Sequence, residues 1–441
     1  MKQLEKICSE IGYKKIDGLG ESISKFFDIS CTELAGAEQL SRWYNVEMPG
    51  VRKLLSLYLD EFISLFAGDG RFRVYASVPC PTVIAAAFNS GGRVRISTAE
   101  LCVMIVLHGI LGASAAAVDY NAGGRCAMMQ NRRAYIESGI LPRPDLLWSF
   151  GLLCDECCKT DELIHSVNEI KQISSFCAKS YSDTRFRRYE ESLRSGISEL
   201  CTAAGIPEPD GRGAREKANL AAMLCAGICC ANAAADCPPL KAATVSLIQT
   251  SQLMAFGNID LLIDALTDIR NDMRRAKRPD RITKLYSYYI PPCVPELGAI
   301  FEDNGLRLAG SAAFITRPVQ HTHSADLAGA AAAAWDSSIL SRSSAEYAAE
   351  TAKAICKYNC AAYLNGMFEF DRWLGAGHKL TDGEIESLSG RPVLQCGTDF
   401  WGTDFSQAKI ENLAETAAYV CKYAGQPYDA ISEEQEKQYH D

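Results

Sequence analysis

Residues 74–96 read VYASVPCPTVIAAAFNSGGRVRI, and this stretch indicates the fold. A run rich in β-branched and aromatic residues ends in Pro-Cys, and a helix-like run of small apolar residues follows it. Two glycines then close the helical run before another short apolar run begins. A strand, a helix and a second strand in this order form a βαβ unit, whose two strands lie parallel in one sheet. The sequence therefore predicts an α/β fold.

The same pattern occurs again in residues 285–309, which read LYSYYIPPCVPELGAIFEDNGLRLA. At an offset of 213 positions, six residues of the first copy are identical to residues of the second: Tyr75 and Tyr288, Pro79 and Pro292, Cys80 and Cys293, Ala86 and Ala299, Phe88 and Phe301, and Gly92 and Gly305. The agreement in both pattern and residue type favours an internal duplication. We therefore expect two Rossmann-like, doubly wound domains that are related by this duplication.

Length and local composition divide the chain further. At 441 residues it exceeds what a single core usually holds. Apolar runs predict strands near 71–78, 92–97 and 144–150, and then near 284–290, 306–311, 361–368 and 392–396. Helical stretches are expected at 158–204 and 217–276. The expected parts are an N-terminal helical cap (1–70), a first α/β domain (71–204), a linker and helical segment (205–281) and a second α/β domain (282–441).

Charge and composition exclude several classes of function. The formal net charge is -9 and the pI is near 5.4, whereas proteins that bind nucleic acid or anionic membranes need a basic face. Two segments, 101–118 and 218–235, are near the length of a membrane span, but they are rich in Ala, Gly and Cys and are expected to be buried core helices. The N-terminal stretch MKQLEKICSEIGYKK has no apolar signal-peptide core, so we expect a cytoplasmic protein with reduced thiols.

Nineteen cysteines are many for a reduced chain, and metal ligation is the usual physical reason to carry exposed thiolates there. Residues 126–160 read CAMMQNRRAYIESGILPRPDLLWSFGLLCDECCKT, in which an apolar run delivers Cys154 to the expected start of a helix. The free N–H groups and partial positive charge of a helix N-terminus lower a thiol pKa and hold anionic clusters. The alternative is that these cysteines are small buried hydrophobic residues.

Four stretches, in this order along residues 71–421, resemble the benzoyl-CoA reductase and 2-hydroxyacyl-CoA dehydratase family. They are VPCPTVIAAAFNSGG, then Cys126 followed by PRPDLLWSFGLLCDECCKTDELI, then PPCVPELGAIFEDNGLRLAGSAAF, and finally RPVLQCGTDFWGTDFSQAKIENLAETAAYV. The resemblance implies two Rossmann-like domains with a thiolate-held iron–sulfur cluster, a [4Fe–4S] cluster first of all, between them. It also implies a low-potential reductase or radical dehydratase that acts on acyl-CoA thioesters.

The resemblance further implies an ATP-hydrolysing activator protein that energises the electron. The chain has no GxxxxGK[ST] sequence of its own, which fits this division of labour. A homodimer, or a heterodimer with a related subunit, is expected.

Carried over residue by residue, the resemblance assigns Cys126 and Cys154 to the two cluster ligands of the first domain. The third ligand departs from the family pattern, because MFEFDRW places Glu369 where the family usually has a cysteine. Cys396, at the next expected strand end in VLQCGTD, is the replacement candidate. If neither residue holds iron, the cluster has been lost from this chain.

Two other interpretations remain open. The family includes double-cubane cluster proteins, which reduce small molecules and need more thiolates; Cys80, Cys293 and Cys396 are the additional candidates at expected strand ends. Alternatively, the chain is the cluster-poor structural partner of such a heterodimer, or its function lies outside this family.

Overall fold

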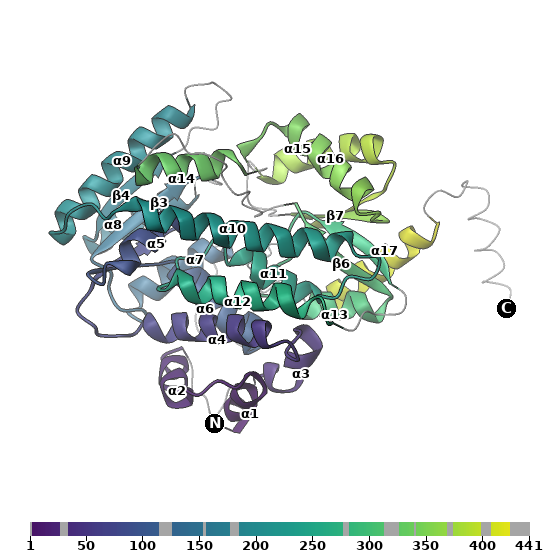
Figure 1. The fold of residues 1–441 in the computed structure, drawn as a ribbon, viewed down its shortest axis with the longest axis horizontal. Coiled ribbons are helices and arrows are strands. Elements are labelled where there is room, and N and C mark those ends of the chain that lie inside the picture. The colour runs from purple at the N-terminus through teal and green to yellow at the C-terminus, as the bar shows by residue number, and fades with distance from the viewer. Residues whose placement is uncertain are drawn as a thin grey trace.

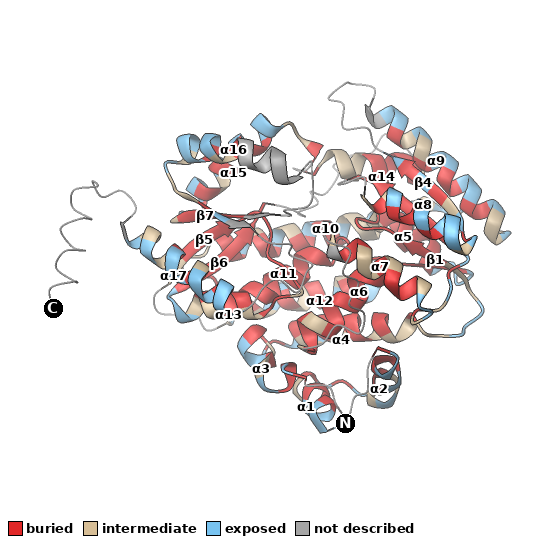
Figure 2. Ribbon diagram, turned by 180° about the vertical axis from the view of Figure 1, so that it is seen from behind, coloured by how far each residue is buried: buried red, intermediate tan, exposed pale blue. Residues whose placement is uncertain are grey.

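The computed structural model of the chain is an α/β structure that contains two four-stranded parallel sheets (Figure 1). The structure describes residues 2–26, 34–113, 126–152, 156–176, 185–276, 282–312, 326–338, 341–367, 374–397 and 407–423. Within these residues, buried side chains are concentrated in the sheets and in the helices between them (Figure 2). The core of the molecule therefore runs through both sheets.

The first sheet has the strand order β2-β1-β3-β4, and neighbouring strands are parallel. Its strands are β1 (Phe72–Ala76), β2 (Val94–Ser97), β3 (Leu146–Gly151) and β4 (Lys171–Phe176). Its helices are α5 (Thr82–Ser90), α6 (Ala99–Met104), the π-helix η1 (Ile105–Ile110), α7 (Ala127–Glu137), α8 (Glu156–Asn168) and α9 (Arg185–Ala204). β1 and β3 are thus the central strands, and ligand sites in such sheets lie beyond the carboxyl ends of the strands.

The second sheet has the order β6-β5-β7-β8, which is the same arrangement in chain order. Its strands are β5 (Thr283–Ser287), β6 (Leu306–Ser311), β7 (Ala362–Met367) and β8 (Val393–Gly397). The accompanying helices are α13 (Glu296–Asp303), α14 (Leu327–Asp336), α15 (Ser344–Lys357), α16 (Leu374–Ser389) and α17 (Gln407–Tyr423). Ser343 and Glu346 form a capping box that fixes the start of α15.

Three helices between the sheets hold the two halves together: α10 (Gly211–Ala234), α11 (Ala242–Thr250) and α12 (Ile259–Asp272). α10 contacts α5 of the first half and β6 of the second, and all nine residues of α11 are buried. By length and composition α10 could cross a membrane, but it packs here as a central helix, and 44% of its most apolar window is buried. Its apolar character therefore reflects its contacts with both halves.

The N-terminal region is helical, as expected. It consists of α1 (Lys2–Ile11), α2 (Ile16–Ser24), α3 (Gly36–Trp43) and α4 (Pro49–Ser64). Pro49 stands at the first position of α4, where its missing N–H costs no helical hydrogen bond. α4 packs against α12, so these helices cover one side of the molecule, below the central helices in Figure 1.

The seven strands expected from the sequence are present, but one further strand was missed. The helical prediction for 158–204 is wrong at Lys171–Phe176, which forms β4 at the edge of the first sheet. In KQISSF only Ile173 and Ser175 are buried, and Ile173 is its one β-branched residue. A polar edge strand of this kind gives a weak periodic signal, because one of its faces and its free edge meet solvent.

Equivalent residues of the two halves are 211 positions apart in the strands but 213 positions apart in the turns that follow. Tyr75, the fourth residue of β1, pairs with Leu147 of β3, and the fourth residue of β5, Tyr286, pairs with Tyr363 of β7. Tyr286 lies 211 positions after Tyr75, whereas Gly92 and Gly305, which share positive φ angles of 70° and 72°, lie 213 apart. The sequence alignment of Tyr75 with Tyr288 is therefore wrong by two residues in the strands.

Candidate functional site

The carboxyl ends of the two sheets meet on α11 and on the segment 251–257 that follows it. On the second sheet, Ser311 Oγ at the end of β6 donates to Gln249 Oε1 at 2.7 Å, and Ser246 Oγ donates to the carbonyl of Ile290 beyond β5. On the first sheet, Thr82 Oγ1 donates to the carbonyl of Gln252 at 3.1 Å, and Thr98 Oγ1 accepts from the Ala255 N–H at 3.2 Å. One buried stretch of chain, α11 with the segment 251–257, thus contacts the carboxyl edge of both sheets.

A buried ionic triad lies at this edge of the first sheet. Arg132 on α7 donates from Nε and Nη2 to the two carboxylate oxygens of Asp161 on α8, at 2.7 and 3.1 Å. Arg132 Nη1 donates to Glu100 Oε2 on α6 at 2.8 Å. The three side chains are 1%, 0% and 1% exposed, so the triad (Arg132, Asp161 and Glu100) is shielded from water. A bidentate guanidinium–carboxylate pair fixes the relative position of two helices closely.

The triad is also tied to the strands. Arg132 Nη2 donates to the Tyr75 carbonyl at 2.9 Å and Nη1 to the Ala76 carbonyl at 3.3 Å, at the end of β1. Asp161 accepts from Ser149 Oγ of β3 at 2.7 Å. Hence α6, α7 and α8 are held against the central strands β1 and β3 by hydrogen bonds that involve ionised groups.

Burial and neighbouring charges shift the pKa values of two members of the triad, Glu100 and Arg132. Burial raises the pKa of Glu100 and outweighs Arg132, which lowers it. Burial opposes the charged form of Arg132, but Asp161 and Glu100 together raise its pKa above the ordinary value. The guanidinium therefore keeps its charge in this buried position, whereas burial makes the Glu100 carboxyl a weaker acid than usual.

Cys126 and Cys154, the first-domain ligands implied by the resemblance, belong to the starts of α7 and α8. Cys126 is the N-cap residue of α7, is partly buried, and its carbonyl accepts from the N–H groups of Met129 and Gln130 at 3.1 Å. Cys154 lies outside the described residues, two positions before α8 begins at Glu156. Because α7 precedes β3 and α8 follows it, both helices begin at the carboxyl edge of the first sheet.

The candidates for the third ligand are described less fully. Cys396 is the fourth residue of β8, where its backbone pairs with Gly366 of β7; its side chain lies outside the described residues. Glu369 lies outside the described residues as well. In the described part of the chain there is no group of three or more His, Cys, Asp or Glu residues that could hold a metal ion.

Cys80 and Cys293, the additional candidates, occupy different environments. Cys80 is 1% exposed, and burial, followed by the charge of Glu100, raises the pKa of its thiol. Cys293 is partly buried on a segment that packs against η1 of the first half. The contact is close: a Cβ on Gly109 would lie 2.3 Å from the Pro292 carbonyl oxygen. A glycine in η1 is therefore what lets the second half approach the first here.

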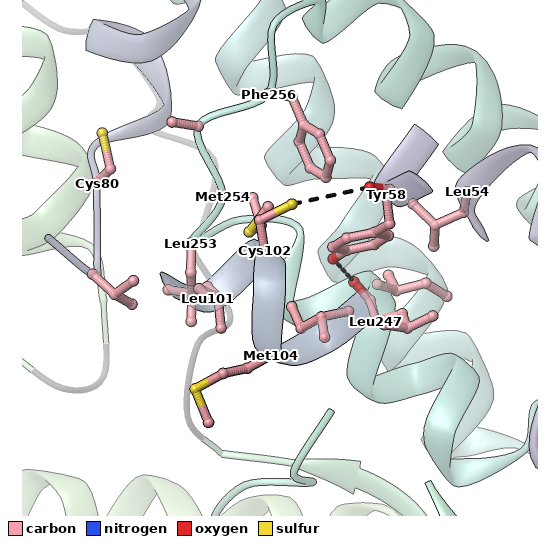
Figure 3. Packing of buried hydrophobic residues seen from close by; sticks show 14 of the residues in the cluster. Leu54, Tyr58, Cys80, Leu101, Cys102, Met104, Leu247, Leu253, Met254 and Phe256 are labelled. Carbon is pink, nitrogen blue, oxygen red and sulfur yellow. Dashed lines mark hydrogen bonds between the residues drawn. The ribbon is translucent and has the colours of Figure 1, made fainter. Parts of the chain in front are cut away.

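Other cysteines are packing residues. Cys102 on α6 lies in an apolar cluster with its Sγ 4.0 Å from the Tyr58 carbonyl, and Cys80 lies on a separate segment (Figure 3). Cys157 is 1% exposed and its thiol donates to the Phe150 carbonyl at 3.5 Å. Cys225 and Cys229 on α10 are also buried. These thiols fill space in the core.

The edge of the second sheet holds a related arrangement, in which two amides contact an aspartate. Asp382 on α16 accepts from Asn365 Nδ2 of β7 at 2.5 Å and from Gln395 Nε2 of β8. Asn365 is the fourth residue of β7 as Ser149 is the fourth residue of β3, and each donates to an aspartate on the helix that follows its strand.

Comparison with known proteins finds no match to this chain, either among protein-family models or among curated proteins. The site is therefore interpreted from its residues.

Sequence reasoning missed the triad. Glu100 stands in the apolar stretch STAELCVMIVL, and a single charge in such a run is a signal for a buried, paired group. Arg132 was harder to find, because it is adjacent to Arg133, which forms a partly exposed pair with Glu137 at 2.8 Å. Composition does not tell which of two neighbouring arginines points into the core.

Proposed function

We propose that the chain is an iron–sulfur subunit of an ATP-activated, low-potential reductase or radical dehydratase that acts on acyl-CoA thioesters. The observation that carries the proposal is the triad. It joins α7, whose N-cap is Cys126, to α8, which follows Cys154, and both helices begin at the carboxyl edge of one sheet. The N-termini of these two helices would favour thiolates and an anionic cluster at this edge.

One of the three candidate ligands, Cys126, has an environment that suits a thiolate-held cluster. Cys126 is partly exposed at a helix N-terminus, where a thiolate is favoured, and together with Cys154 and Cys396 it would hold the iron. A cluster of this kind supplies an electron at low potential. The chain itself would orient the substrate and exclude water at the joined sheet edges, where α11 contacts the second half and the buried segment 251–257 contacts the first. The double-cubane alternative needs thiolates from Cys80 and Cys293, and the burial of Cys80 disfavours the first of these.

Our proposal includes an internal duplication of a Rossmann-like domain. The identical strand orders of the two sheets support it, as does the aspartate that follows the third strand of each half and contacts the fourth residue of that strand. It also includes a cytoplasmic location, an ATP-hydrolysing activator and a homodimer or a heterodimer with a related subunit.

The test is the iron and acid-labile sulfide content of the chain after anaerobic purification, with an absorption spectrum. About four irons per chain support a single cubane, and about eight support a double cubane. Cys126→Ala should abolish the iron content, while the matched control Cys356→Ala, at an exposed thiol of α15, should leave it unchanged.

Two results would contradict the proposal. A folded wild-type protein that stays colourless after reconstitution with iron and sulfide is not a catalytic iron–sulfur subunit. If that colourless chain associates stably with a related, cluster-bearing subunit, it is the structural partner of the heterodimer.

A further inference from the structure

The triad contains more negative than positive charge. One guanidinium, on Arg132, faces two carboxyl groups, on Asp161 and Glu100, and all three side chains are at most 1% exposed. Burying an uncompensated charge is strongly unfavourable, and proteins usually avoid this cost by taking up or releasing a proton. A neutral triad therefore needs one proton on one of the two carboxyl groups.

The hydrogen bonds distinguish the two carboxyl groups. Both oxygens of Asp161 accept from Arg132, and one of them also accepts from Ser149 Oγ, so this group has the environment of a carboxylate. Glu100 uses only Oε2 toward Arg132, and its buried Oε1 has no hydrogen-bond partner among the residues that the structure describes. An oxygen without donors around it is the natural place for the proton.

The groups around Glu100 do not supply a second cation. Besides Arg132 and Asp161, its titratable neighbours are Cys80 beyond β1, Tyr75 on β1 and Cys102 on its own helix, all of which are neutral when protonated. α4 also packs against α6, and its Glu61 is paired with Arg95. On η1, His108 Nδ1 lies 3.3 Å from the carbonyl of Ala113, and burial lowers the pKa of this histidine, so it is neutral.

We propose that the triad holds one proton on Glu100 Oε1 at neutral pH, so that the buried side chains at the carboxyl edge of the first sheet carry no net charge. This protonation state is independent of the proposed function.

The substitution Glu100→Gln tests this state directly. An amide has the shape of a protonated carboxyl group, and its oxygen can still accept from Arg132 Nη1. The infrared C=O stretch of buried protonated carboxyl groups should be present in the wild type at pH 7 and lose the Glu100 contribution in E100Q. The unfolding midpoint of E100Q should stay within a few degrees of the wild type.

Two further variants make the assignment specific. In Asp161→Asn, Glu100 becomes the only carboxyl group able to neutralise Arg132, so it should ionise and the same infrared band should disappear. Glu296→Gln is the matched control, because burial raises the pKa of Glu296 too, and any band that it contributes is then identified separately.

An infrared band that is unchanged in E100Q would show that Glu100 is ionised and would overturn the proposal. If E100Q fails to fold, the band in D161N decides instead, and its persistence there would overturn the proposal. These measurements use the purified protein with or without iron. A chain that binds no iron but loses the band in E100Q would therefore contradict the proposed function and leave the proton on Glu100 in place.

Discussion

The two sheets share a strand order but stabilise their functional edges differently. In the first half, the aspartate that follows the third strand binds a buried arginine, and charge joins three helices to the sheet. In the second half, the equivalent aspartate accepts from two amides, and buried tyrosines such as Tyr347 and Tyr363, whose hydroxyl groups lie 2.6 Å apart, fill the interior. The same strand order therefore supports two sheet edges of different chemistry. We expect stability to depend more on a single side chain at the first edge than at the second.

Arg132→Met should have the largest effect. It leaves Asp161 buried without a counter-charge, and removing one partner of a buried ion pair typically costs about 3–5 kcal/mol of the free energy of unfolding. Arg133→Met is the control, since Arg133 pairs with Glu137 on the partly exposed side of the same helix and should change stability by less than about 1 kcal/mol. Denaturant unfolding of both variants measures the difference; equal losses would show that the triad does not stabilise the first half.

Gly109→Ala should disturb the junction of the two halves. Its new Cβ would lie 2.3 Å from the Pro292 carbonyl oxygen, so the loop must move, and overpacking of this kind costs about 1–3 kcal/mol. Gly227→Ala on α10 is the opposite case, because nothing lies within 4 Å of its Cβ, and an alanine there should stabilise the helix by about 0.5–1 kcal/mol. Thermal unfolding measures the midpoint of each variant. A shift of both midpoints in the same direction would contradict this packing.

Asp382→Asn should have a smaller effect than Arg132→Met. Asp382 is partly exposed and accepts from Asn365 and Gln395; an asparagine keeps one acceptor and turns an amide group toward one of the donors. The loss of one such hydrogen bond costs about 1–2 kcal/mol. Denaturant unfolding measures it, and a loss as large as that of Arg132→Met would remove the contrast between the two edges.

How much of this comparison was predictable depends on the side chains involved. The βαβ pattern predicted the α/β fold, and local apolar runs predicted seven of the strands. The two-residue difference between the halves was not visible, since an ungapped comparison aligned Tyr75 with Tyr288, and the strand pairing places Tyr286 there instead. The triad joins residues 29 and 32 positions apart, and no local pattern encodes such contacts.

The same limit applies to the candidate ligands. Cys126 at a helix N-terminus was predictable from the sequence that follows it, and the structure places it at the N-cap of α7. The burial of Cys80 was not predictable, because a cysteine after a strand is compatible with both a ligand and a packing residue. Only the packing of the folded chain, in which Cys80 is 1% exposed, decides between them.

The smallest expected effect is the pH dependence of stability that Glu100 contributes. Burial raises the pKa of Glu100 above its ordinary value of 4.5, so the folded chain binds a proton that the unfolded chain releases. The unfolded state then has fewer protons, and the free energy of unfolding falls as the pH rises from about 4.5 through the folded-state pKa. In Glu100→Gln this decline should disappear, so the stability difference between wild type and variant should change steadily over that window. Glu386→Gln, on α16 of the second half, is the control and should leave the decline in place. A wild-type stability that instead rises over the same window relative to E100Q would mean that Glu100 is ionised in the folded state and that the charge of the first edge is balanced in another way.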